Sequence, residues 1–221
     1  MTLYSPQYVV GGVLRSTLSI VNLDNVGGVV TLRMVGDNGV QIGATRVVNV
    51  AGGGKAYISD QAFFDSTVVT NPGQLRSGYV EVTGANVRLT GSVVFGDAAG
   101  SKYIAALPLV STLWKSVLFS HIASNETSFT GVAVLNPGSA GATVRIELFD
   151  SGGKSTGSTT QVLPAGQRTS RLLTEYFPGL VAKDGRPAYF KVTADREVAC
   201  FALFGSNNLS VLSAIPAQPV P

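Results

Sequence analysis

Few side chains in this sequence have the types and spacing that chemistry requires. His121 is the only histidine and Cys200 the only cysteine among the 221 residues. A serine hydrolase needs a histidine between a serine nucleophile and a carboxylate, but His121 lies in LFSHIASNETS, which has no G-x-S-x-G or other nucleophile motif nearby. One histidine and one cysteine cannot supply the four ligands of a structural zinc site. We therefore expect no catalytic residue, no metal and no cofactor.

Paired carboxylates are a second possible source of chemistry, because two of them can hydrolyse a glycosidic bond. The candidates are Glu147, Asp150, Glu175 and Asp184. The first half of the chain has no carboxylates at the matching positions, so we interpret these four as solvated surface charge. The DNG and DSGG motifs lack the further acidic positions of a calcium loop. Gly52-Gly53-Gly54 lacks the lysine and hydroxyl residue of a phosphate-binding loop, so it is interpreted as a turn.

The candidate side chains lie within an internal repeat, whose elements must position them. The segment VLNPGSAGATVRIELFDSGGK at 134–154 is an altered copy of IVNLDNVGGVVTLRMVGDNGV at 20–40, with Asn136 over Asn22 at an offset of 114 residues. The register is kept by Gly27/Gly141, Val30/Val144, Gly39/Gly153, Gly43/Gly157, Thr45/Thr159, Ala51-Gly52/Ala165-Gly166 and Phe63/Phe177. After a length change, YVEVT at 79–83 matches YFKVT at 189–193. We therefore predict a tandem duplication with domains at 1–112 and 113–221.

Each copy consists of short alternating segments with turns between them, which is typical of a β-sandwich. The inward residues are predicted to be Val144, Ile146 and Leu148 in one copy, and Val30, Leu32 and Met34 in the other. Strands in the second copy are expected at 130–136, 142–150, 156–163, 167–173, 187–194, 197–205 and 209–216. The segments 59–65 and 173–180 depart from this period. Each predicts a one-turn helix, capped by Ser59 or Thr174, that plugs an open end with Phe63 or Phe177.

The second copy reads N-P-G, alternating strand, F-D-S-G-G turn, L-P-A-G, strand and Y-F-P-G. This order resembles the immunoglobulin-like β-sandwich repeats of secreted and surface proteins of environmental bacteria. The first copy departs from it, with Leu23-Asp24 in place of Pro137-Gly138 and Val50 in place of Pro164. The resemblance implies an all-β fold of two tandem immunoglobulin-like sandwiches. It also implies a spacer, an adhesive module or a subunit of an assembly.

Composition narrows the classes of partner. Charged residues make up 13% of the chain, against roughly 25% in average soluble domains. The mean hydropathy is +0.29, but no run approaches the roughly 18 apolar residues of a membrane span. The pI near 9.1 arises from charges spread over both copies, and only 168–171 and 183–191 are locally basic, so nucleic acid is not expected. MTLYSPQYVVGGVLR has no features of an export signal, and an exported location is expected from composition alone.

The segment EVACFALFG at 197–205 is apolar on both faces, whereas its counterpart has Thr90 and Ser92 on the outer face. Such a strand is normally covered on both sides. We therefore expect Ala199, Phe201 and Leu203 to form an interface with the other domain or with another subunit. Cys200 shares the opposite, core-facing side and is expected to be a buried, unreactive thiol.

From these observations we predict that the protein is a non-enzymatic structural or adhesive building block of the cell surface or extracellular space. Its expected partners are copies of itself, as a homo-oligomer or filament, or other surface components. The alternative is a carbohydrate-binding module, with a glycan as partner. Such a module needs exposed aromatic platforms, and the single tryptophan, Trp114, lies at the junction of the copies.

Overall fold

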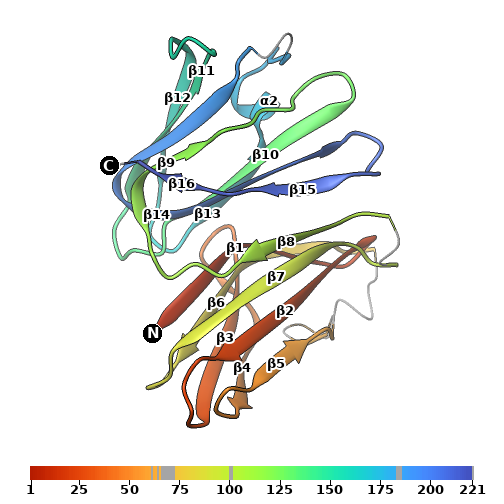
Figure 1. Ribbon diagram of the computed structural model, residues 1–221, viewed down its shortest axis with the longest axis vertical. Coiled ribbons are helices and arrows are strands. Elements are labelled where there is room, and N and C mark those ends of the chain that lie inside the picture. The colour runs from red at the N-terminus through yellow and green to blue at the C-terminus, as the bar shows by residue number, and fades with distance from the viewer. Residues whose placement is uncertain (61, 64, 66–72, 100–101, 183–185, 221) are drawn as a thin grey trace. The chain divides into compact units, whose positions relative to one another are not determined.

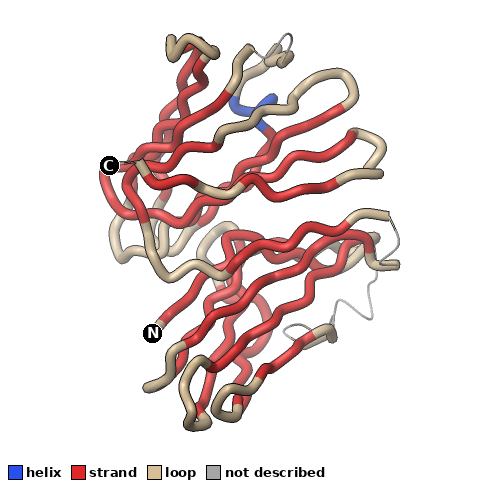
Figure 2. The backbone as a smooth tube through the Cα atoms, in the orientation of Figure 1, coloured by secondary structure: helices blue, strands red, loops and turns tan. Residues whose placement is uncertain are grey.

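Alternating apolar and polar residues form antiparallel strands over most of the chain. The computed structural model describes residues 1–60, 62, 63, 65, 73–99, 102–182 and 186–220 (Figure 1). It divides into two compact units, Met1–Ser111 and Thr112–Pro221, with a boundary one residue before the one expected from the repeat. Figure 2 shows that strands make up most of the described residues in both units. In the described residues, no helix is long and apolar enough to cross a membrane.

Unit 1 contains two four-stranded antiparallel sheets. The first has the strand order β1-β6-β3-β4 and the second β5-β2-β7-β8. The strands are β1 (Thr2–Val10), β2 (Leu14–Asn22), β3 (Gly28–Gly36), β4 (Gln41–Val50), β5 (Lys55–Ile58), β6 (Arg76–Gly84), β7 (Leu89–Asp97) and β8 (Ile104–Pro108). The strands β4, β5, β1 and β8 are therefore the edges of these sheets.

Unit 2 has the same strand order, although one long strand joins its two halves. The elements are β9 (Trp114–Phe119), β10 (Ser128–Leu135), β11 (Ala142–Phe149), β12 (Ser155–Leu163), β13 (Arg168–Leu172), α2 (Leu173–Tyr176), β14 (Tyr189–Ser206), β15 (Leu212–Ile215) and β16 (Gln218–Pro219). The first part of β14 lies between β9 and β11, and its second part lies between β10 and β15. The resulting orders are β9-β14-β11-β12 and β13-β10-β14-β15, with β16 beyond β9.

The strand neighbours agree with an immunoglobulin domain at the centre and differ at the flanks. In unit 1, β2 pairs with β5 and β3 pairs with β6, as strands B and E and strands C and F pair in immunoglobulin domains. However, β7 lies beside β2 where strand A would lie, and β1 lies beside β6 where strand G would lie. The β-sandwich character is therefore observed together with a different arrangement of the outer strands.

The predicted inward residues are confirmed in both units. Val30, Leu32 and Met34 in β3, and Val144, Ile146 and Leu148 in β11, are all buried. The two cores are filled differently around equivalent pairs of strands. In unit 2 the cross-strand pair Phe119 and Phe190 stacks with ring centroids 4.8 Å apart. The equivalent pair in unit 1 is Ser5 and Val80, and the largest fully buried side chain there is Tyr8.

Three boundaries differ from the sequence prediction. The segments 187–194 and 197–205 form one continuous strand, β14, because Ala194 to Val198 remain extended. Residues 114–119, where no strand was expected, form β9, which pairs with β14 on one side and with β16 on the other. The helical turn at α2 is confirmed, but Thr174 lies inside it. The Leu172 N–H is instead capped by the Glu175 carboxylate at 2.7 Å. The turn predicted at 59–65 includes residues outside the described part of the chain.

A buried asparagine closes the same loop in each unit. The Asn22 amide donates to the carbonyl oxygens of Val26, Val50 and Ala51, and its Oδ1 accepts the N–H of Asp24. Asn136 donates in the same way to Ala140, Leu163 and Pro164, and accepts from Gly138. Both side chains are essentially inaccessible to solvent. Each asparagine therefore links the end of one strand to the loop that follows the hairpin.

The equivalent hydrogen bonds show that the gapless alignment is wrong by one residue beyond the hairpin. The turns match at an offset of 114, with Gly39 and Gly153 at φ values of 78° and 81°. Beyond the turns, Ala51 occupies the place of Pro164, an offset of 113, and Gly53 and Gly166 have φ values of 65° and 68°. The extra residue lies in β4, where a bulge interrupts the pairing with β3.

Candidate functional site

The structure does not assemble a catalytic group around His121. Its side chain is exposed, and its ring packs edge-to-face on Phe204 with centroids 4.9 Å apart. Within the described residues, no hydrogen bond joins this imidazole to a serine hydroxyl or to a carboxylate. The same part of the chain contains no group of three histidine, cysteine or acidic residues that could hold a metal ion.

The candidate carboxylates take part in local structure. Glu147 accepts from Arg145 at 2.8 Å and from the Ser155 hydroxyl at 2.7 Å, and these hydrogen bonds lower its pKa. Asp150 accepts from two backbone N–H groups of its own turn. Glu175 caps α2. Asp184 lies outside the described residues. The described carboxylates are thus held by strands, turns and caps, and do not converge on one point.

The locally basic segments do not form a cluster of free cations in the described residues. Arg168 is buried. The guanidinium of Arg171 lies over the Tyr176 ring, 5.7 Å from its centroid. Lys191 lies at a half-buried position of β14, and Lys183 falls outside the described residues.

The predicted apolar stripe is buried within the chain. Ala199, Phe201 and Leu203 are only 2, 9 and 8% exposed. The interface role of these residues stays a prediction. Cys200 is buried as expected, and burial raises the pKa of its thiol far above the usual range. The thiol is therefore protonated and shielded at neutral pH.

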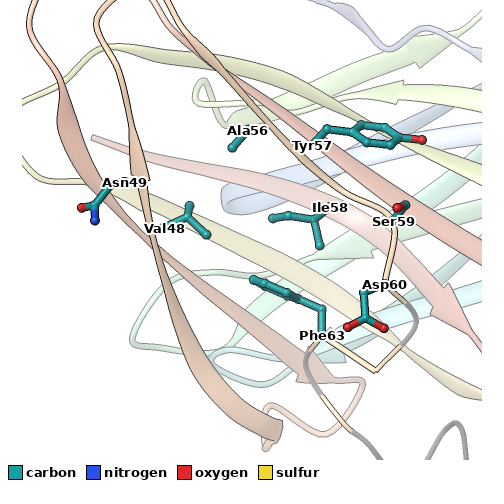
Figure 3. A pocket seen from close by; sticks show the side chains of 8 residues that line it. All are labelled: Val48, Asn49, Ala56, Tyr57, Ile58, Ser59, Asp60 and Phe63. Carbon is teal, nitrogen blue, oxygen red and sulfur yellow. The ribbon is translucent and has the colours of Figure 1, made fainter.

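One hollow of unit 1 lies between the edge strands of its two sheets. We call it the β4–β5 hollow. It has a volume of about 520 Å³ and is lined by Val48, Asn49, Ala56, Tyr57, Ile58, Ser59, Asp60 and Phe63. Figure 3 shows the Phe63 ring directed toward Val48 and Ile58. Phe63 therefore lines this hollow from the segment where the plug was expected, and the plug itself stays a prediction.

Tyr57 is a site residue that the sequence reasoning missed. Its side chain is 61% exposed at the rim of the β4–β5 hollow and points away from Val48 and Phe63 (Figure 3). The Lys55 ammonium lies 5.4 Å from the ring centroid. The signal was present in the sequence, because Ala56 and Ile58 alternate with Tyr57 and place its ring on the outer face.

Unit 2 has a matching hollow beside β12. It has a volume of about 490 Å³ and is lined by Leu148, Thr156, Gly157, Tyr176, Phe177, Pro178, Gly179, Leu180, Val181 and Pro187. Phe177 packs against the core here, and its role as a plug of the open end stays a prediction. Among the described residues, no charged side chain lines this hollow, whereas Asp60 lines the β4–β5 hollow.

One polar pair of β-strand neighbours occurs in both units with its charges reversed. In unit 1, Arg33 on β3 donates to Glu81 on β6 at 3.0 Å. The equivalent neighbours in unit 2 are Glu147 on β11 and Lys191 on β14. Burial next to the Glu81 carboxylate raises the pKa of Tyr79 to about 12. Both units therefore have two opposite charges facing each other across these strands. Such a pair stabilises the sheet whichever strand carries the positive charge.

The edge strands β4 and β12 occupy equivalent places but differ in chemistry. Strand β4 contains Arg46, whose Nε donates to the Phe63 carbonyl oxygen and whose guanidinium lies 5.7 Å from the centre of that ring. With an offset of 113, the residue in its place on β12 is Thr159. Strand β12 has the sequence STGSTTQVL, with no charged residue and no proline.

Neither a scan of protein-family models nor a search of curated proteins found a match for this chain. The site must therefore be interpreted from its own geometry.

Proposed function

We propose that this protein is a non-enzymatic structural or adhesive building block of the cell surface or extracellular space that associates with copies of itself. As part of this proposal, its two units are tandem immunoglobulin-like sandwiches that arose by internal duplication. The proposal treats the strand framework, and not a reactive side chain, as the functional part of the molecule.

The observation that carries the proposal is the difference between what the two units share and what they do not. They share a strand order, the buried asparagine with its three carbonyl partners, and the glycine of the hairpin turn. They do not share the candidate catalytic groups, because Glu147 corresponds to Arg33 and His121 has no histidine counterpart. The two units thus share their backbone framework although their polar side chains differ. This supports a function that depends on the shape of the units and on their contacts with other molecules.

Self-association is tested by sedimentation of the pure protein over a range of concentrations. We expect species larger than the 22.9 kDa single chain, in increasing amounts as concentration rises. The dissociation constant follows from the concentration dependence. A protein that sediments as the single chain up to its solubility limit would contradict the self-association.

Carbohydrate binding is a second candidate, and the exposed ring of Tyr57 at the rim of a hollow that Asp60 and Asn49 also line favours it. Sugar-binding surfaces combine an aromatic face with carboxylate or amide groups that fix orientation. Tyr79 and Tyr189 are less suited, because Tyr79 is buried and Tyr189 stacks on Phe149 with centroids 5.0 Å apart.

A glycan array probed with the labelled protein tests this second candidate. Binding at the β4–β5 hollow predicts that Tyr57→Ala weakens any glycan signal by about two- to tenfold, because one aromatic contact contributes roughly 0.5–1.5 kcal/mol. Tyr189→Ala is the matched control on the other unit and should leave the signal unchanged. An array without signal, or equal loss in both variants, counts against the hollow as a sugar site.

A further inference from the structure

Edge strands expose unpaired backbone groups, and proteins commonly protect them with charge, proline, bulges or short length. The edge strands of unit 1 and most of those in unit 2 carry such protection. In the described part of unit 1, β1 contains Pro6 and bridges to Val110, β5 is four residues long and carries Lys55, and β8 is five residues long and ends at Pro108. In the described part of unit 2, β9 carries Lys115 and pairs with β16, and β13 carries Arg168 and Arg171. Strand β15 has only four residues.

Strand β4 is protected in two further ways. Arg46 is a charged residue at an inward position of an edge strand, a recognised device against strand addition. A bulge also interrupts β4, because Ile42 to Arg46 lies opposite only Leu32 to Met34. Within this stretch Gly43 has a φ of 65°. Uninterrupted pairing with β3 therefore covers five residues, Arg46–Val50, and only Gln41 and Ile42 pair with β3 on the other side of the bulge.

Strand β12 has one register shift at its start, between Ser155 and Gly157, and carries none of these protections from Gly157 to Leu163. Residues Gly157 to Leu163 pair with β11 in seven successive positions without interruption. Thr159, in the place of Arg46, is half-buried and neutral. Val162 is 69% exposed on the outer face. In the described part of the chain, no backbone hydrogen bond joins β12 to any strand other than β11. Figure 1 shows β12 at the margin of its sheet.

We propose that β12 is the self-association site, and that β12 of a second copy adds to it antiparallel, forming a closed two-fold dimer. This inference rests on the proposed self-association and names its contact. A second copy fits this edge because the strand is uncharged, so that it meets its own sequence without like-charge repulsion. Antiparallel pairing over Gly157–Leu163 places Thr160 opposite Thr160 and Ser158 opposite Val162. Inward residues then meet inward residues, so both hydrophobic faces keep their side.

A dimer, and not a filament, follows from the difference between the two edges. Only one of the two equivalent edges, β12, is free of charge and of a long bulge, so each chain contributes one pairing surface. An interface that uses the same strand of both copies is isologous and closes on itself. Removing the protection of β4 would supply a second surface and permit growth beyond two chains.

The test transfers the β4 protection to β12. Thr159→Arg is expected to raise the dimer dissociation constant by about tenfold or more, because two arginines then approach across the pairing. Thr159→Val keeps a neutral β-branched side chain and should remain dimeric. Arg46→Thr is expected to add species larger than a dimer. Sedimentation gives the sizes, and far-ultraviolet circular dichroism checks that each variant is folded. Unit 1 already accommodates arginine at this position.

A second readout does not depend on the stability of the variants. Thr160→Cys should form a disulfide-linked dimer under mild oxidation, since facing residues of antiparallel strands lie within disulfide distance. Val47→Cys, at the equivalent place on β4, should not, and the buried Cys200 does not interfere. Association that survives Thr159→Arg, with no Thr160→Cys link, would reject β12 and leave the proposed function standing. A monomeric wild type would reject both.

Discussion

Replacing Phe190 by alanine is expected to lower the free energy of unfolding of unit 2 by about 3–5 kcal/mol. Phe190 is fully buried and stacks on Phe119 at 4.8 Å, so its removal leaves a cavity between two strands. The loss is large compared with the roughly 5–15 kcal/mol that stabilises a typical domain. Denaturant unfolding followed by tryptophan fluorescence measures it, because the only tryptophan, Trp114, lies in β9 of the same unit.

Two variants separate the cavity from other effects. Phe190→Leu keeps most of the apolar volume and should cost less than about 1.5 kcal/mol. Val80→Ala removes the equivalent residue of unit 1 and should leave the Trp114 transition unchanged if the two units unfold independently. A Phe190→Ala protein whose fluorescence midpoint matches the wild type would show that the stacked pair does not hold unit 2 together.

The alternation of side chains could be predicted from the sequence because it is a local property. Val144, Ile146 and Leu148 are buried as expected, since their period follows directly from the strand geometry. The positive φ of Gly39 and Gly153 was predictable in the same way, from turn chemistry. The burial of Cys200 also follows from its position on the inward side of β14.

The equivalence of the two edges could not be read from the sequence. Gly43 matches Gly157 and Thr45 matches Thr159 at an offset of 114, so identity favours an alignment without a gap. The bulge in β4 adds one residue, and its presence depends on pairing with β3. The true counterpart of Thr159 is therefore Arg46. The contrast between a charged and a neutral edge becomes visible only once the hydrogen-bond register is known.

The exchange of the outer strands also depends on long-range pairing. Strand β1 lies beside β6, and β2 lies beside β7, although each pair is separated by more than fifty residues in sequence. Propensity indicates that such segments are strands but does not select their neighbours. For the candidate site, the outward direction of Tyr57 could be predicted from the sequence, whereas a hollow that Tyr57 and Asn49 both line requires β4 and β5 to lie close together.

The second large effect is expected at the buried asparagine. Asn136→Ala removes the donor for three carbonyl oxygens and the acceptor for the Gly138 N–H, at distances of 2.8–3.1 Å. Buried polar groups that lose their partner are costly, so we expect a loss of about 2–4 kcal/mol in the free energy of unfolding. Denaturant unfolding monitored by Trp114 measures this loss. Asn22→Ala should produce the equivalent change in unit 1.

Asn136→Asp gives a sharper version of this prediction, because it keeps the shape and changes only the amide. An ionised carboxylate there would face the carbonyl oxygens of Ala140, Leu163 and Pro164, which raises the pKa of the new side chain in the folded state. The unfolded value is about 3.9. The penalty from ionisation is therefore absent below that pH and grows as pH rises toward the folded pKa. Asn136→Asp should lose stability from acid to neutral pH relative to wild type, whereas Asn136→Ala should differ from wild type by a constant amount. Parallel curves for the two variants would mean that the amide does not face the carbonyls, and that the loop is held by packing alone.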